Sequence, residues 1–528
     1  MPAYRMLLRL NEANHKMATR REFGRLGLGA LTLAVASNTG IRMGRAQTLT
    51  EESIIYLPAS ELISLFKSKE LSPVDLLKAQ IDRYQSVNEL INCVTYTHFE
   101  SAMKQARQSE ERYLRGTARP LEGITVGVKD EHHDAGWIMT QGSILEKDSR
   151  QDSADPVVQK LKQSGAVLPI QTTVPEFYLN AVTWTRLWGV SRCPWNLKYT
   201  VGGSSGGSGG ALAAGMCTLA TGSDMGGSIR LPCAYNGLYG FKPPFGRFHS
   251  DLPLSYFAGS GPMARTFQDM ISLYNVISGP DKYSPNTLPK EDLPYNYPNI
   301  RGTRIAYSQG LGLAEPDTDT QRMMQKAIAV LRSAGAVVDE VDINPGYRVE
   351  DTTELFVKGA LGGAMGGWLA DMADRSDEMT TYAASFVKKA ASGKYGNQAV
   401  YEYERFVNSF HSRVVDTVFG NGYQALIMPS LITSHVPADY DLTKGGFMMN
   451  GSELYSGFIF AYTAPWNFLN WYPVVNVPTG LTAQGMPSGM QIIGSPYRDS
   501  TVMQIAHSYA ALANPLFVGD RVPEFKNA

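Results

Sequence analysis

Two clusters rich in glycine and serine give the chain its clearest sign of chemistry. The first covers Gly202 to Gly210 and the second covers Gly222 to Ser228. Such runs are typical of flexible linkers, but the first lies just ahead of a small-residue helix pattern that begins at Ala211, where a linker is out of place. A phosphate-binding loop is disfavoured because no lysine follows the glycines. Two Gly-Gly-Ser elements joined by a helix and a strand can instead fold back and bring two serines together.

The order of motifs around these clusters resembles the amidase signature family. The resemblance is strongest over residues 202–247 and continues on both sides of them. The outlying motifs are Lys129-Asp130, Thr140, Gly142-Ser143, Gly240-Phe241-Lys242-Pro243, Gly246-Arg247, Pro478-Thr479-Gly480 and Gly489-Met490-Gln491-Ile492-Ile493-Gly494. The resemblance implies an α/β fold: a single large domain over residues 47–528, with a signature core at 121–250 and a central mixed β-sheet flanked by helices on both faces.

The resemblance also implies a catalytic triad. Ser228 matches the nucleophile that becomes acylated, Ser204 matches a serine reached through a cis peptide from Gly203, and Lys129 matches the base. A serine hydroxyl is a weak nucleophile until a neighbouring group takes its proton. Lysine can do so only when neutral, so burial must lower its pKa from about 10.4. Ser204 would relay the proton between Ser228 and Lys129.

The same comparison assigns an oxyanion hole to the run Met225, Gly226, Gly227 and Ser228, whose main-chain N–H groups would face the developing negative charge. One such donor is typically worth about 3–4 kcal/mol in acyl transfer. Asp224 and Arg230 flank the nucleophile, and we expect them to pair and hold the turn. No cofactor and no metal are implied.

The implied activity is amidase: hydrolysis of a carboxamide to a carboxylate plus ammonia or an amine through an acyl-serine. The amide-splitting subunit of an amidotransferase complex and an ester or carbamate hydrolase on the same triad remain alternatives. A Ser-His-Asp hydrolase is disfavoured, because the string Gly206 to Gly210 that fits its nucleophile elbow does not follow an apolar strand.

One segment departs from the family pattern. Glu131-His132-His133-Asp134 stands where family members usually carry asparagine or another small polar residue. Adjacent histidines point apart on a strand, and no partner with metal-ligand spacing occurs. We therefore expect His132 and His133 to be polar residues of the surface or of the pocket rim, and the departure to affect the shape of the substrate near Lys129.

The elements that must position these residues follow from hydrophobic spacing. Residues 58–116 predict a helical layer with a short strand at 92–97, and 124–128 a strand that delivers Lys129. Residues 155–164 predict a helix and 166–170 a strand, which indicates an α/β sheet. Residues 315–336 and 353–415 are predicted helical, with a break at 362–368.

The N-terminal segment resembles a twin-arginine export signal. Thr19-Arg20-Arg21-Glu22-Phe23 precedes an apolar run at 24–37 that is too short for a permanent membrane anchor. Residues 1–46 are thus expected to be cleaved, and the mature protein to be periplasmic or secreted. The alternative is a helical extension with a chance arginine pair.

The expected partner is a small amide. A net charge of -1 disfavours nucleic acid and anionic lipid, and we expect no membrane contact after signal removal. The oligomeric state stays open, and a homodimer is compatible with the sequence.

The substrate-binding residues are unknown at this stage. The uncharged aromatic segment 455–472 favours protein core over pocket. If part of it lined the site with Trp184, Trp188 or Tyr235, an apolar or aromatic acyl group would fit. The four cysteines are expected to be mostly buried free thiols, although one disulfide is compatible with export.

Overall fold

The computed structural model describes residues 32–33, 47–48, 51–249, 257–362 and 364–526. The chain divides into one unit at residues 1–54 and a second at 55–528. In the first unit, β1 (Thr32–Leu33) pairs with β2 (Gln47–Thr48), and α1 spans Glu51–Ile54. The predicted export motif at 19–23 lies outside the described residues. In the described part of the chain, none of the helices has both the length and the apolar character needed to cross a membrane.

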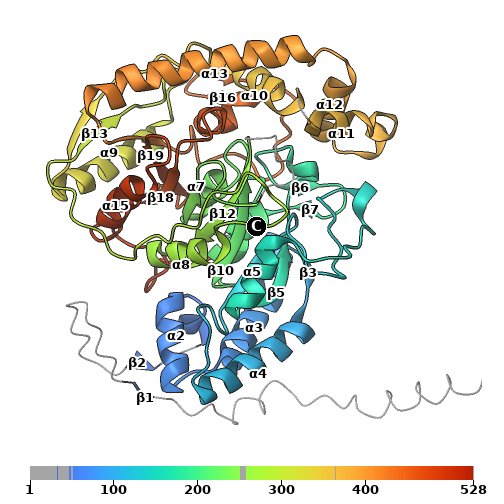
Figure 1. The fold of residues 1–528 in the computed structure, drawn as a ribbon, viewed down its shortest axis with the longest axis vertical. Coiled ribbons are helices and arrows are strands. Elements are labelled where there is room, and N and C mark those ends of the chain that lie inside the picture. Colours follow the sequence, from blue (N-terminus) through green and yellow to red (C-terminus); the bar gives the residue numbers. More distant parts are fainter. Residues whose placement is uncertain (1–31, 34–46, 49–50, 250–256, 363, 527–528) are drawn as a thin grey trace, which may run out of the picture. The chain divides into compact units, whose positions relative to one another are not determined.

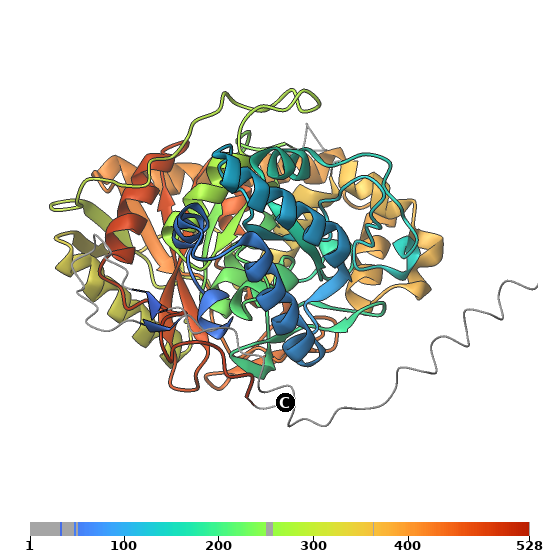
Figure 2. The same cartoon turned by 90° about the horizontal axis from the view of Figure 1, so that it is seen from below.

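The second unit is built on a mixed sheet of eleven strands, with helices packed on both of its faces (Figures 1 and 2). From one edge to the other, the strands are β14 (Val337–Glu340), β13 (Arg304–Tyr307), β15 (Ala425–Pro429), β19 (Pro487–Gly494), β18 (Val474–Leu481), β11 (Tyr239–Lys242), β12 (Gly259–Ala264), β10 (Leu219–Asp224), β4 (Thr125–Lys129), β5 (Val167–Thr172) and β3 (Val94–Thr97). The α/β fold class predicted from the sequence is confirmed.

The helices of this unit are α2 (Ala59–Ser68), α3 (Pro73–Ile91), α4 (Phe99–Arg115), α5 (Pro156–Ser164), α6 (Gly206–Ala213), α7 (Arg230–Asn236), α8 (Phe267–Ile277), α9 (Thr318–Ser333), α10 (Thr352–Leu361), α11 (Ala364–Ala370), α12 (Thr381–Ala391), α13 (Asn397–Thr417), α14 (Pro465–Phe468) and α15 (Asp499–Ala510). Short strand pairs lie outside the sheet: β6 (Trp184–Thr185) with β7 (Gly189–Val190), β8 (Arg192–Cys193) with β9 (Asn196–Thr200), and β16 (Phe447–Met449) with β17 (Ser452–Leu454).

Local sequence explains why several helices begin where they do. Ser72 caps α3 by accepting the Asp75 N–H, with Pro73 in the first turn. Asp155 caps α5 through the Val157 and Val158 N–H groups. The long helical region predicted at 353–415 is broken more often than expected, into α10, α11, α12 and α13.

The glycine cluster itself forms a helix, which the sequence did not predict. Helix α6 begins at Gly206, five residues before the expected start at Ala211. Glycine is a poor helix former, but a Cβ at Gly207 would overlap the Thr173 backbone, and one at Gly210 would overlap the Cys93 side chain. The glycines therefore let α6 pack directly against β5 and β4, and this tertiary gain outweighs local propensity.

The register of the central strands places the candidate catalytic residues at the carboxyl ends of β4 and β10. Strand β10 runs parallel to β4, with Leu219 opposite Val126. Strand β4 in turn runs parallel to β5, with Lys129 opposite Thr172. Because parallel strands end on the same side of a sheet, the last residues of β4 and β10 lie together.

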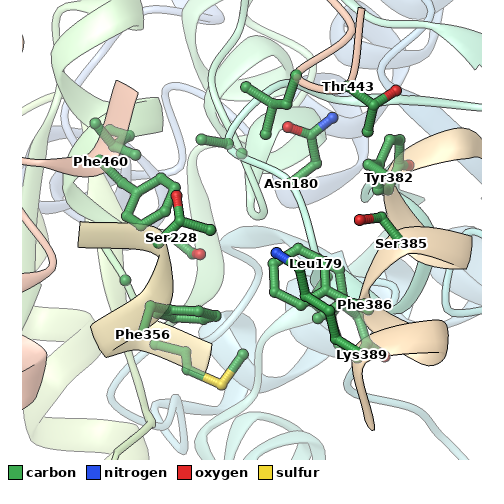
Figure 3. Close-up of a pocket in the computed structure, with 18 residues that line it drawn as sticks. Leu179, Asn180, Ser228, Phe356, Tyr382, Ser385, Phe386, Lys389, Thr443 and Phe460 are labelled. Carbon is green, nitrogen blue, oxygen red and sulfur yellow. The ribbon is translucent and has the colours of Figure 1, made fainter. Parts of the chain in front are cut away.

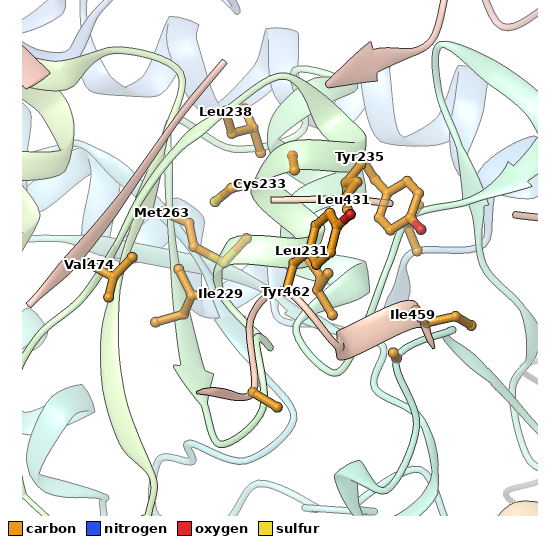
Figure 4. Close-up of a cluster of buried hydrophobic side chains, with 14 of the residues drawn as sticks. Ile229, Leu231, Cys233, Tyr235, Leu238, Met263, Leu431, Ile459, Tyr462 and Val474 are labelled. Atoms are coloured by element: carbon orange, nitrogen blue, oxygen red, sulfur yellow. The ribbon is translucent and has the colours of Figure 1, made fainter. Parts of the chain in front are cut away.

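The apolar core surrounds α7, the helix that directly follows Ser228 (Figure 4). Buried side chains from this helix and its flanks pack against strands β12 and β18 and against the aromatic segment 455–472. The cluster, from α7 and the segments packed on it, includes Ile229, Leu231, Cys233, Tyr235, Leu238, Met263, Leu431, Ile459, Tyr462 and Val474. The segment 455–472 is thus mainly core, as its composition predicts. All four cysteines are buried free thiols.

Candidate active site

Lys129, the last residue of β4, has a side chain that is 0% exposed. Its Nζ donates to Ser204 Oγ at 2.9 Å and to Ser223 Oγ at 2.7 Å. The Glu131 carboxylate lies 2.8 Å from the same nitrogen. Burial lowers the pKa of Lys129 below its ordinary value, while the charge of Glu131 and, more weakly, that of Asp224 oppose the shift.

Glu131 and Ser223 are neighbours of this amine that sequence reasoning missed. The Ser223 hydroxyl accepts from Lys129 and donates to Glu131 Oε2 at 2.5 Å. Burial alone would raise the pKa of Glu131, but the Lys129 charge keeps it below its ordinary value. The departure from the family pattern at Glu131 therefore acts on the amine itself. The position of Glu131 in the sequence, two residues after Lys129, was the signal that could have indicated this contact.

Ser204 and Ser228 are joined through their loops. The peptide bond between Gly203 and Ser204 is cis, as the resemblance implies. The Ser205 N–H donates to the Ser228 carbonyl at 3.2 Å, which ties the two glycine clusters together. Among the described residues the Ser228 hydroxyl has no hydrogen-bond partner, and Ser228 lines a cavity with Gly203 (Figure 3). Lys129 and Ser204 do not line that cavity.

Asp224 and Arg230 hold the turn that carries Ser228. Arg230 Nη2 lies 2.8 Å from Asp224 Oδ1, and both side chains are fully buried. Asp224 also accepts the N–H groups of Gly227 at 2.8 Å and Ile229 at 3.1 Å. Burial would raise the pKa of Asp224, but the Arg230 charge and its hydrogen bonds bring it well below the usual range. The expected structural pairing of these residues is confirmed.

The hydrogen bonds within this turn leave fewer main-chain N–H groups to bind an oxyanion than the sequence predicted. The Gly227 N–H is already donated to Asp224, although the sequence comparison placed it in the oxyanion hole. Within the described residues, the N–H groups of Met225, Gly226 and Ser228 have no protein acceptor. Gly227 has a φ of +127°, a conformation open to glycine, so it shapes the turn. Met225, Gly226 and Ser228 border the cavity.

His132 does not lie on the surface or at the pocket rim. It is only 4% exposed, and its Nδ1 lies 3.2 Å from the Asp155 carboxylate. Burial would lower the pKa of His132, but Asp155 raises it above its ordinary value. The expectation failed because Asp155, which caps α5, faces the loop after β4, a contact no local pattern reveals. In the part of the chain that the structure describes, no cluster of His, Cys, Asp or Glu could hold a metal ion.

Other polar groups near the site are structural. Ser208 Oγ donates to the Thr221 carbonyl at 2.8 Å, and Ser205 Oγ to the Ser223 carbonyl at 3.3 Å. The buried Asp130 accepts the Thr140 N–H at 3.1 Å, and burial raises the pKa of Asp130 to about 7.

The cavity beside Ser228 has a volume of about 280 Å³. Its walls are mostly apolar. The side chains Leu179, Leu231, Phe356, Phe386, Leu442 and Phe460 contribute to them. From the aromatic segment 455–472 only Phe460 reaches the wall, and Trp184, Trp188 and Tyr235 are absent from the lining that the structure describes. Trp188, for example, donates from Nε1 to Thr140 Oγ1 at 3.1 Å.

Comparison with known proteins gives one consistent family. A family model described as Amidase matches residues 75–503. A glutamyl-tRNA(Gln) amidotransferase subunit of Carboxydothermus hydrogenoformans is 30% identical over 481 residues, covering 86% of this chain and 97% of that protein. The acylamidase of Rhodococcus erythropolis is 28% identical over 477 residues, covering 88% of this chain and 97% of that protein. The crystal structure of a bacterial aryl acylamidase of the amidase signature family matches this chain with a TM-score of 0.77 at 26% identity. The match covers 87% of this chain and 96% of that one.

The Asp224–Arg230 pair yields a stability prediction. Arg230→Met leaves a buried carboxylate without its counter-charge, so we expect the free energy of unfolding to fall by about 3–5 kcal/mol. Lys104→Met, which breaks the exposed pair with Glu100, should leave the free energy of unfolding almost unchanged. Urea denaturation of both variants measures the difference. Equal losses would contradict a structural role for the buried pair.

Proposed function

We propose that this chain, which belongs to the Amidase family, hydrolyses a carboxamide through an acyl intermediate on Ser228. The observation that carries the proposal is the buried Lys129 amine, 2.9 Å from Ser204 Oγ, behind a cavity that Ser228 borders. Burial stabilises the neutral amine, which is the form able to accept a proton.

The reaction then proceeds in two halves. Ser228 Oγ attacks the amide carbon while its proton passes through Ser204 to Lys129. The tetrahedral oxyanion faces the main-chain N–H groups of Met225, Gly226 and Ser228. Lys129 returns the proton through Ser204 to the leaving nitrogen, the C–N bond breaks, and ammonia or an amine departs. Water, deprotonated along the same route, hydrolyses the ester and restores the Ser228 hydroxyl.

We propose a stand-alone hydrolase in preference to one component of an amidotransferase complex. The relatives include both kinds of protein. The predominantly apolar cavity beside Ser228 suits an apolar acyl or amine group. An export signal, where it operates, would also remove the chain from a cytoplasmic complex. Hydrolysis of a simple anilide by the isolated chain supports this choice, and activity that requires added partner proteins would refute it.

Ser228→Ala tests the nucleophile. We expect kcat/KM for an anilide to fall by at least about 10⁴-fold, because no other hydroxyl takes over the attack. A fluorophosphonate should label the wild type at Ser228, located by mass spectrometry of peptides, and should not label the variant. Circular dichroism serves as the folding control. Activity near the wild-type level in Ser228→Ala would end the assignment.

Glu131→Gln tests the state of the base. The Glu131 carboxylate raises the pKa of Lys129, so its removal lets burial lower that pKa further. Lys129 then becomes neutral at lower pH, and the acidic limb of the kcat/KM profile should move to lower pH. Asp134 lies in the same loop as Glu131, and its carboxylate pairs with Lys162. Asp134→Asn should leave the acidic limb of the kcat/KM profile in place. A limb that stays fixed, or moves upward, in Glu131→Gln would contradict this role.

We also propose that residues 1–46 direct twin-arginine export and that the mature enzyme is periplasmic or secreted. The support is the order of residues Thr19 to Phe23 and the apolar run that follows. Replacing Arg20 and Arg21 together by lysine should retain the uncleaved chain in the cytoplasm, as cell fractionation and immunoblotting would show. Unchanged distribution of the double variant would contradict the proposal.

A further inference from the structure

The cavity beside Ser228 contains one charged side chain, Lys389. It lies on α12 and is the only ionisable lysine, arginine, aspartate or glutamate in the lining that the structure describes. Figure 3 shows its side chain extending from the helix into the cavity on which Ser228 also opens. A cation therefore shares an otherwise uncharged pocket with the nucleophile.

The Lys389 ammonium has no anionic partner in the described part of the chain. It lies over the face of the Phe386 ring, 5.7 Å from the ring centre. Neighbouring lysines differ: Lys358 pairs with Glu402 at 2.8 Å, and Lys394 pairs with Glu354 at 3.2 Å. A half-buried lysine whose ammonium lies over an aromatic ring gains most from an anion.

A hydroxyl is placed to assist the same ligand. Ser385 lies four residues before Lys389 on α12, and residues at this spacing share one face of a helix. Both residues line the cavity beside Ser228 and also a wider depression outside it. An ammonium and a hydroxyl on one helix face can bind the two oxygens of a carboxylate.

We propose that Lys389, with Ser385, binds a carboxylate on the substrate, so that the preferred amides carry an apolar segment and one acidic group. This inference rests on the proposed function at Ser228. The leucine and phenylalanine walls hold the apolar segment, the carbonyl lies at Ser228, and the acidic end reaches Lys389. Lys389 is thereby a specificity residue and takes no part in bond breaking.

Two matched substrate pairs test the proposal. Glutaryl-4-nitroanilide against valeryl-4-nitroanilide places the carboxylate on the acyl part, and 4-acetamidobenzoate against acetanilide places it on the amine part. The readout is the ratio of kcat/KM for the acidic over the neutral member. We expect the wild type to favour the acidic member of at least one pair, and Lys389→Met to lower that ratio by about 10- to 100-fold, as loss of one charged hydrogen bond predicts.

Lys388→Met is the matched control. Lys388 is the neighbouring residue on α12 and is exposed, and it borders the outer depression but not the cavity beside Ser228. Its substitution removes the same charge, so general attraction of anions would lower the ratio equally in both variants. We expect a wild-type ratio in Lys388→Met. Lys389→Glu should reverse the preference toward the neutral member.

The outcomes separate this inference from the proposed function. If fluorophosphonate labels Ser228 and neutral anilides are hydrolysed, but the wild type shows no preference for either acidic substrate, carboxylate recognition is overturned alone. An equal fall of the ratio in Lys388→Met and Lys389→Met overturns it as well. Absence of both labelling and hydrolysis overturns the function at Ser228. The wild-type ratio of kcat/KM requires no variant, so carboxylate recognition is tested even if Lys389→Met does not fold.

Discussion

The site depends on one constraint, the exclusion of water from the Lys129 amine. Burial lowers the pKa of this group, whereas the Glu131 carboxylate 2.8 Å away raises it. The two influences oppose each other, and burial is the larger, so the pKa of Lys129 lies below its ordinary value. Strand β4 supplies the burial because it lies between β10 and β5 in the sheet, with neighbours on both sides.

A second buried charge pair, Asp224 with Arg230, positions the turn that carries the nucleophile Ser228. Asp224 ends β10 and accepts main-chain N–H groups from the turn that contains Ser228. Arg230, at the start of α7, neutralises that carboxylate and also donates to Asn467 and Gln491. The turn is thereby anchored to the sheet and to distant segments of the chain. Such a network limits the conformational freedom of the turn that contains Ser228.

The sequence predicted those parts of the molecule whose cause is local. Hydrophobic spacing placed β4 and α5, and motif order singled out Lys129, Ser204 and Ser228. What it could not provide depends on contacts between distant segments. Helix α6 contradicts glycine propensity because β5 and Cys93 demand close approach. The burial of His132 depends on Asp155, and the place of Lys389 in the pocket depends on how α12 folds back. Neither position carries a motif.

The two lysines of the site show how one side chain can take opposite roles. Lys129 is sealed from solvent, and this burial favours its neutral form even though the Glu131 carboxylate opposes the effect. Its contact with Ser204 then suits proton transfer. Lys389 lines the cavity, and its ammonium lies over the Phe386 ring without an anionic partner among the described residues. An ammonium that solvent and ligands can reach is placed to bind an anion. Solvent access therefore separates the residue that can move protons from the residue that can select the substrate.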